Sequence, residues 1–289
     1  MSRLQRIACT ILLTSLAITA IASESASEKS EWRRPNPENL IVLQLPDGSV
    51  VIELAPVFAP ASIANIKTLV RERYYDGLAI IRSQDNYVVQ WGDPADEDAD
   101  ARPLGSAAVT VTPEFTRPAD GLDISTIDSR DAYADVVGFA DGLPVGSDGE
   151  RAWLTHCYGM VGVARGTEPD SGNGSSLYVV TGHAPRHLDR NITLVGRVVS
   201  GIEELTTLPR GTAALGFYES ADEMTPIVSV KLGSEIEPQD RPKVEILRTD
   251  SDEFSDYVRS RTYRNEDWFV EPTGRIEICN LHPPTRPST

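Results

Sequence analysis

Few residues in this sequence have both the type and the spacing needed for catalysis or metal binding, and two histidines are the first to consider. His183 and His187 stand four residues apart, a spacing that puts two imidazoles on one face of a helix and could hold a metal ion. Pro185 lies between them and disfavours that helix, so we predict no metal site here. The segment SGNGSS (residues 171–176) sets serines among glycines, as hydrolase loops do. It lacks the Gly-x-Ser-x-Gly pattern, and no acid and histidine partners are evident.

Acidic residues dominate the charge of the chain. Its 289 residues include 43 Asp and Glu against 27 Lys and Arg, a formal net charge of −16. A surface of this sign repels nucleic-acid phosphates, so we predict no nucleic-acid partner. The acidic run from Asp93 to Asp100 could bind calcium, but it lacks the residue order of an EF-hand loop. It therefore predicts a solvated surface loop.

The first 22 residues have the pattern of a secretory signal peptide. Arg3 and Arg6 form a basic start, residues 7–21 are an apolar run, and Ala20-Ile21-Ala22 has the form of a cleavage site. The run is shorter than the roughly 20 residues that a membrane-spanning helix needs, which disfavours an uncleaved anchor. The sequence thus predicts an exported protein, periplasmic or alternatively secreted, with no membrane insertion after cleavage.

Cleavage would also remove Cys9 and leave two cysteines. Cys157 and Cys279 form an even pair in a compartment that is expected to be oxidising, which favours a disulfide between them. The alternative is two separately buried thiols, because cysteine is among the most buried residue types.

The rest of the chain is rich in short β-strand patterns. Residues 23–38 are polar and predict a flexible lead-in. Residues 40–54 predict a β-hairpin around a Pro-Asp-Gly turn, and apolar residues between Ile63 and Val70 recur at helical spacing. Further β-rich runs cover residues 80–81, 87–90, 107–112, 159–164, 177–181, 193–199 and 227–232. Short strands between Gly, Pro and Asp clusters are typical of an antiparallel barrel or sandwich.

Two segments depart from that pattern. Residues 94–151 are long, acidic and Gly-rich, and predict large loops around one strand. Residues 236–289 predict a separate β-α-β extension, with strands at residues 244–247 and 275–279 around a helix that contains Phe254 and Tyr257.

Three stretches resemble cyclophilin-type peptidyl-prolyl cis/trans isomerases, and they follow one another in the family's order. GSVVIELAPVFAPASIANIKTLVRERYYDG (residues 48–77) is similar to the family's opening hairpin, helix start and Tyr-Asp-Gly. IIRSQDNYVVQWGDP (residues 80–94) is similar to its Phe-His-Arg signature and the Gln-Gly-Gly-Asp beyond it. YGMVGVARGTEPDSGNGSSLYVVTGHAPRHLDRNITLVGRVVSG (residues 158–201) is similar to its Met-Ala strand, Asn-Gly-Ser turn, His-Leu-Asp loop and Phe-Gly-Arg-Val strand.

The resemblance implies an all-β fold: a closed antiparallel cyclophilin-like barrel with two helices over residues 39–235, carrying the 94–151 insertion and followed by the 236–289 extension. It also implies the activity. Rotation about an X-Pro bond faces a barrier of about 18–20 kcal/mol but breaks no bond, so it requires no nucleophile, metal or cofactor. A catalyst must hold the proline ring in an apolar socket and favour the twisted amide. We therefore expect the protein to be a monomeric isomerase that acts on proline-containing segments of exported proteins.

The resemblance also carries the site residues over. Arg82 would donate to the prolyl nitrogen of the twisted amide and is the catalytic residue. Without its flanking motif Arg82 would be read as a surface arginine in a salt bridge. The remaining expected binding residues are Tyr87, Val88, Tyr178 and Leu188 around the proline ring, Gln90 and Arg165 on the peptide backbone, and Ser176 and His187 at positions where the family has Gln and Trp or His.

The departures at Ile81, Ser176 and His187 motivate an alternative hypothesis. In it the protein is a cyclophilin-like module that grips proline-containing segments with little turnover. A third hypothesis is a scaffold whose interface is the 236–289 extension. It predicts that deleting the extension abolishes partner binding while the barrel stays folded.

Overall fold

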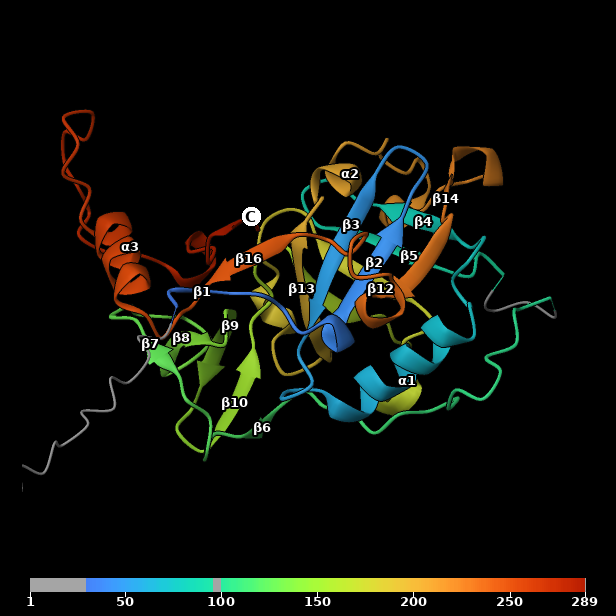
Figure 1. The fold of residues 1–289 in the computed structure, drawn as a ribbon, viewed down its shortest axis with the longest axis horizontal. Helices are drawn as coiled ribbons and strands as arrows, with labels where there is room; N and C mark the ends of the chain where they lie inside the picture. Colours follow the sequence, from blue (N-terminus) through green and yellow to red (C-terminus); the bar gives the residue numbers. More distant parts are fainter. Residues whose placement is uncertain (1–29, 96–99, 289) are drawn as a thin grey trace, which may run out of the picture. The chain divides into compact units, whose positions relative to one another are not determined.

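Antiparallel sheets make up most of the fold, which is described for residues 30–95 and 100–288 by a computed structural model (Figure 1). The described residues from Glu31 onward belong to one structural unit. The main sheet has nine strands in the order β14 (Thr225–Pro226), β4 (Ala79–Ser83), β5 (Val88–Gly92), β12 (Leu177–Val180), β11 (Met160–Val163), β13 (Leu194–Ser200), β3 (Ser49–Leu54), β2 (Leu40–Gln44) and β15 (Ser229–Leu232). The hairpin predicted for residues 40–54 is confirmed as β2 and β3.

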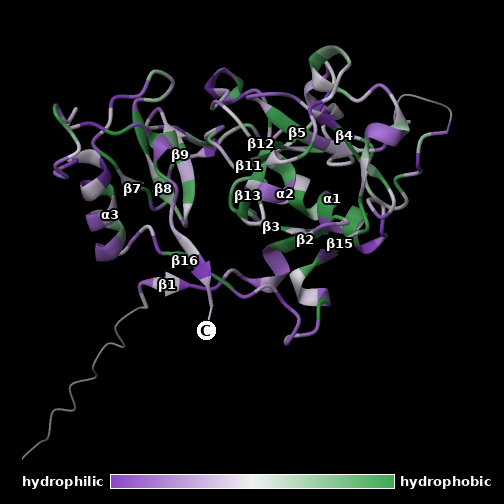
Figure 2. Ribbon diagram, turned by 90° about the horizontal axis from the view of Figure 1, so that it is seen from above, coloured by the Kyte–Doolittle hydropathy of each residue, from purple (hydrophilic) through white to green (hydrophobic). Residues whose placement is uncertain are grey.

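The main sheet is a half-barrel, so the prediction of a closed barrel is not confirmed. The sheet has two edge strands, β14 and β15. In the chain only Ile227 and Val228 lie between these two strands. Along each strand alternate side chains turn inward. The inward residues, such as Val89, Val161 and Val179, form the main core. Figure 2 shows hydrophobic residues concentrated on the strands that surround it.

Two α-helices accompany the main sheet, α1 (Pro60–Arg71) and the one-turn α2 (Glu203–Thr206). α1 buries one face against the main core, as its helical spacing predicts. Its N-cap residue Ala59 has no side chain that can accept a hydrogen bond. The Glu114 carboxylate takes that role, accepting from the main-chain N–H groups of Ala61 and Ser62 at 2.9 and 2.8 Å. The insertion thereby caps a helix of the main domain.

The insertion, together with the strand that follows it, forms a second sheet and not large loops around one strand. The five strands of this sheet lie in the order β6 (Arg117–Pro118), β10 (Arg151–Leu154), β9 (Leu143–Ser147), β8 (Val136–Ala140) and β7 (Ser125–Thr126). Residues 107–112, where we predicted a strand, have none. β8 and β9 form a hairpin through Asp141 and Gly142, both at positive φ, which is the two-residue turn that such hairpins favour.

The insertion and the C-terminal extension share a second hydrophobic core. Phe139 and Val145 from the insertion pack in it with Phe254 and Ile278 from the extension, and Met160 of β11 also contributes. The Cys157–Cys279 disulfide lies in the same core, which confirms the predicted pairing. The extension is therefore joined to the rest of the chain by packing as well as by a covalent bond.

The extension has the predicted β-α-β order, but its last strand lies at residues 285–287 and not at 275–279. A third sheet has the order β1 (Trp32–Arg33), β16 (Val244–Leu247) and β17 (Thr285–Pro287), and α3 (Asp252–Thr262) follows β16. Residues 275–279 form no strand, because the Glu277 carboxylate accepts from the Cys279 N–H and begins a 3-10 turn at Ile278–Asn280. The alternation that suggested a strand arises because Ile276 and Ile278 both pack into the second core. Figure 2 shows α3 coloured mostly hydrophilic, and it buries little besides Phe254.

The lead-in is ordered over the part that the structure describes. Trp32 and Arg33 pair with β16 as β1, and Pro37–Asn39 form a 3-10 turn. The prediction of a flexible segment is therefore wrong for residues 31–38, because Arg33 is held by two hydrogen bonds to the Glu53 carboxylate, at 2.6 and 3.1 Å. The predicted signal peptide, residues 1–22, lies outside the described residues. None of the described helices has the length and apolar character to span a bilayer.

We predict that removing the disulfide destabilises the protein. The bond joins residues 122 positions apart, and closing so long a loop lowers the entropy of the unfolded chain, for a stabilisation of about 3–5 kcal/mol. Replacing Cys157 and Cys279 by Ser should lower the urea midpoint of unfolding accordingly. Adding a thiol reductant should move the parent to the same midpoint and leave the variant unchanged. Equal midpoints for parent and variant without reductant would contradict the prediction.

Candidate active site

The candidate site is built by the strand register of the main sheet. Directly opposed residues of antiparallel strands point to the same face. Arg82 of β4 is opposite Gln90 of β5, Gln90 is opposite Tyr178 of β12, and Tyr178 is opposite Gly162 of β11. The neighbours of Gln90, Tyr178 and Gly162 along their strands lie in the main core, and so does Ile80 of β4, which precedes a register shift at Arg82. The four residues therefore form one row on the face turned away from that core.

Arg82 is half-buried and held by three protein groups. Its Nε donates to the Leu215 carbonyl at 2.7 Å, one terminal nitrogen donates to Gln90 Oε1 at 3.3 Å, and the other donates to Gln84 Oε1. The guanidinium also lies over the Tyr87 ring, 5.5 Å from its centroid. Partial burial lowers the pKa of Arg82 below the usual arginine value, yet arginine keeps its charge in proteins. In the part of the chain that the structure describes, these bonds use three of the five N–H donors of the Arg82 guanidinium.

A loop that was not predicted from the sequence covers Arg82. Besides Leu215, this loop contributes Phe217, whose ring centroid is 5.3 Å from the guanidinium carbon. Leu215 has a positive φ, and its exposed side chain points away from the core. No sequence signal marked this loop. Gln84 could have been found, because it stands two residues after Arg82 and shares its face.

Ser176 steadies Arg82 through Gln90. Gln90 Nε2 donates to Ser176 Oγ at 3.0 Å, and Ser176 Oγ donates to the Trp91 carbonyl at 3.1 Å. Ser176 is too short to take the place of a glutamine beside Arg82, as its size suggests. Its hydroxyl instead fixes the amide of Gln90, which accepts from Arg82. The departure from the family pattern is thus offset by an indirect contact.

A small apolar cluster lies beside Arg82 and contains three of the four predicted socket residues. Val88 and Tyr178 are buried in it together with Val180, and Tyr87 packs against them. The cluster also takes in Ile192 and Ala164, which the sequence analysis did not single out. Leu188 is not a member. It lies in a 3-10 turn, Arg186–Leu188, with the exposed His187 beside it.

Tyr178 is the best-anchored residue of this cluster. Its hydroxyl is 2.9 Å from His156 Nε2, and His156 Nδ1 is 2.9 Å from Asp189 Oδ1. Burial raises the pKa of Tyr178 above the usual tyrosine value, so its hydroxyl remains a donor. Sequence reasoning missed His156 because its partners are distant in the chain.

Arg165 lies at the rim near the cluster. Its side chain donates to the main-chain carbonyls of Asn191 at 3.0 Å and Gly166 at 2.8 Å. These bonds hold the backbone around Arg165 in place. The family resemblance assigns the main-chain groups of Arg165, and not its side chain, to peptide binding.

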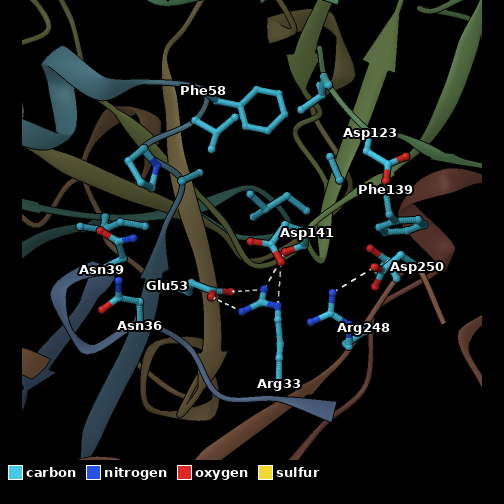
Figure 3. A pocket seen from close by; sticks show the side chains of 18 of the residues that line it. Arg33, Asn36, Asn39, Glu53, Phe58, Asp123, Phe139, Asp141, Arg248 and Asp250 are labelled. Carbon is cyan, nitrogen blue, oxygen red and sulfur yellow. Dashed lines mark hydrogen bonds and ion pairs between the residues drawn. The ribbon is translucent and has the colours of Figure 1, made fainter. Parts of the chain in front are cut away.

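A cavity of about 450 Å³, the junction pocket, lies away from this site (Figure 3). The lead-in, β3, the insertion and the extension line it, and none of the predicted site residues does. Arg33, Glu53 and Asp141 are linked there by hydrogen bonds and an ion pair, and Arg248 pairs with Asp250 at 3.0 Å (Figure 3). Because these charges are satisfied by one another, the pocket offers no obvious site for the predicted chemistry.

Comparisons with known proteins identify the family of the chain. The sequence profile of the family "Cyclophilin type peptidyl-prolyl cis-trans isomerase/CLD" matches residues 40–231. A probable peptidyl-prolyl cis-trans isomerase of Brucella suis is 30% identical over 200 residues, which cover 69% of this chain and 82% of the relative. A putative thylakoid lumen peptidyl-prolyl cis-trans isomerase of Synechocystis is 26% identical over 215 residues, 68% of this chain and 53% of the relative.

Among solved structures, the cyclophilin AquaCyp293 from Hirschia baltica is similar, with a TM-score of 0.70 and 27% identity. The match covers 89% of this chain and 94% of that one, so it extends well beyond residues 40–231.

The chain belongs to the cyclophilin-type peptidyl-prolyl cis-trans isomerase family. It has the cyclophilin fold, mostly strands with few helices, and it is an isomerase.

We predict that Ser176→Ala lowers kcat for a short Xaa-Pro peptide by about threefold. The change removes the hydroxyl that fixes Gln90, so that the Gln90 amide no longer holds Arg82 in one orientation, at a cost near that of one hydrogen bond. Ser175→Ala is the matched control. The main-chain N–H of Ser175 donates to Asn173 Oδ1, and an alanine keeps this bond. Equal kcat values for the two variants, measured by NMR exchange spectroscopy, would contradict this account of Ser176.

Proposed function

We propose that this isomerase acts on X-Pro bonds in proteins exported to the periplasm, assists their folding, and works as a monomer without a cofactor. The observation that carries the catalytic part is the row of Arg82, Gln90 and Tyr178 beside an apolar cluster. The disulfide is consistent with an oxidising compartment. The name of the Synechocystis relative, which refers to the thylakoid lumen, gives further support for a location outside the cytoplasm.

In the proposed mechanism the apolar cluster receives the proline ring. Tyr87, Val88 and Tyr178 would form the socket wall, and Leu188 and His187 would lie at its rim. Apolar surface that the ring and the socket bury from water favours binding, at about 25 cal/mol per Å². This binding is similar for the cis, trans and twisted amide, so the socket sets affinity more than rate.

Arg82 would supply the rate. When the X-Pro amide twists, conjugation is lost and the prolyl nitrogen regains a lone pair that can accept a hydrogen bond. A guanidinium already in place, with donors left over from its protein contacts, stabilises this state more than either planar state. Gln90 and the main chain of Arg165 would hold the peptide backbone on either side.

One observation favours a second candidate, a proline-binding module with little turnover. The Leu215 carbonyl accepts from Arg82 Nε, and Phe217 covers the guanidinium, so part of its donor capacity is directed at the protein itself. In that case a peptide would bind the socket, but the twisted amide would gain little from Arg82.

We predict that Arg82→Ala lowers kcat by about 100-fold or more while KM changes little, because the lost interaction belongs to the twisted state. Arg82→Lys should recover only part of the rate, since an ammonium has neither the fork geometry nor the bond to the Leu215 carbonyl. The kcat and KM of each variant can be measured from NMR line shapes of a short Xaa-Pro peptide. This measurement needs no coupling protease.

The same experiment separates the two candidates. If the parent shifts the resonances of the peptide but does not accelerate exchange, the isomerase proposal fails and the binding module replaces it. If the parent accelerates exchange and Arg82→Ala does so equally, the role of Arg82 is wrong.

A further inference from the structure

His156 is fully buried between the proline socket and the second core. Its main-chain N–H and its Nδ1 both contact Asp189 Oδ1 at 2.9 Å. An ionised Asp189 can only accept, so Nδ1 carries the proton in the neutral ring and Nε2 is an acceptor. Tyr178 then donates its O–H to Nε2 across 2.9 Å. For the neutral ring the contacts thus assign one tautomer and one direction to each bond.

This bond restrains the Tyr178 ring. Tyr178 is opposite Gly162, and an added Cβ at Gly162 would lie 2.3 Å from the Tyr178 hydroxyl oxygen. The ring therefore lies across β11, over a residue with no side chain to stop it from sliding. Moving the ring would leave a buried hydroxyl and a buried imidazole nitrogen without a partner. Unmade bonds of that kind are costly, so the hydroxyl fixes the position of the ring.

Asp189, the partner of His156, is in turn held by contacts that reach the insertion and the extension. Asp189 Oδ2 accepts from Arg186 Nε at 2.6 Å, and the terminal nitrogens of Arg186 pair with Asp131 of the insertion at 2.8 and 2.9 Å. Arg186 also lies 3.5 Å from Glu277 of the extension. The disulfide begins at Cys157, the residue next to His156.

From these contacts we propose that His156 is a positioning residue of the isomerase: it holds the Tyr178 ring in the wall of the proline socket, and the insertion and the extension hold His156 through Arg186 and Asp189. This inference rests on the proposed function, because it takes Tyr178 as part of the socket. It predicts that losing the His156–Tyr178 bond weakens peptide binding and leaves the chemical step unchanged, the reverse of the effect expected for Arg82.

A pair of conservative variants isolates the bond. In His156→Asn the amide takes the place of Nδ1, so it can still donate to Asp189 but does not reach Tyr178. In His156→Gln the amide takes the place of Nε2 and can accept from the Tyr178 hydroxyl. We expect His156→Asn to raise KM for a short Xaa-Pro peptide about fivefold, with kcat within about twofold of the parent. His156→Gln should restore most of the affinity.

The Tyr178→Phe background provides the decisive control. Tyr178→Phe keeps the ring but removes the hydroxyl, and it should by itself raise KM about fivefold. In that background His156→Asn should raise KM no further, because there is no bond left to lose. A purely structural role for His156 would instead raise KM by the same factor in both backgrounds, and that result overturns the proposal. The ¹³Cζ resonance of Tyr178 should also shift in His156→Asn and much less in His156→Gln.

The remaining outcomes are also decisive. If the parent catalyses no exchange, the proposed function has failed, and the ¹³Cζ shift together with peptide titration still tests the positioning role. If the parent is active and His156→Asn leaves KM unchanged, the positioning role has failed while the function stands. Should His156→Asn not fold, Tyr178→Phe removes the same bond from its other end, and an unchanged KM in that variant overturns the proposal.

Discussion

The antiparallel register of β4, β5, β12 and β11 is the constraint on which the site depends. The strand pairing aligns Arg82, Gln90, Tyr178 and Gly162 across four strands, with a register shift in β4 just before Arg82. The same pairing sends the neighbours of Gln90, Tyr178 and Gly162 into the main core. A slip by one residue would exchange the two faces, placing the guanidinium in the core and core residues on the surface. The hydrophobic core therefore specifies which residues form the outward face, where we propose the active site.

The insertion and the extension form a second constraint on the same site. They share a core, and the disulfide joins the extension to Cys157, next to His156. Arg186 pairs with Asp131 of the insertion and with Asp189, which contacts His156. Buried ion pairs often add little net stability, because removing charges from water is costly. Their value here is geometric, since each partner fixes the next. A scaffold role for the extension alone fits these contacts poorly, because deleting residues 236–289 would expose the core that the insertion shares with it.

Local sequence patterns predicted the parts of the fold that local forces decide. The hairpin at residues 40–54, the helical pattern between Ile63 and Val70 and the β-rich run at residues 80–81 all follow from residue type, spacing and turn residues, and they correspond to β2 and β3, α1 and part of β4. The second sheet was missed because its strands are short and interrupted by glycine. Asp141-Gly142 was a readable hairpin signal inside it. The last strand was misplaced because Ile276 and Ile278 alternate like a strand but are buried by a 3-10 turn and the disulfide.

The same distinction between local and long-range contacts separates the site residues that could be predicted from those that could not. Arg82, Gln90 and the aromatic positions could be taken from motifs, because the motif and the strand are the same stretch of chain. His156, Phe217 and Leu215 could not, since each reaches its partner across a long separation in sequence. For instance, His156 meets Asp189 only because β10, β11 and the turn after β12 converge. Contacts of that kind are consequences of the folded topology and leave no periodic trace in the sequence.

The proposed function requires that proline binds the outward row of the main sheet, and intermolecular NOEs detect such binding. A short Xaa-Pro peptide is titrated into protein with labelled methyl groups and aromatic rings. We expect NOEs from the proline ring protons to the Val88 methyls and the Tyr178 ring, next to the Arg82 side chain. NOEs to Phe58 or Phe139 of the junction pocket instead, with none to Val88 or Tyr178, would contradict the account.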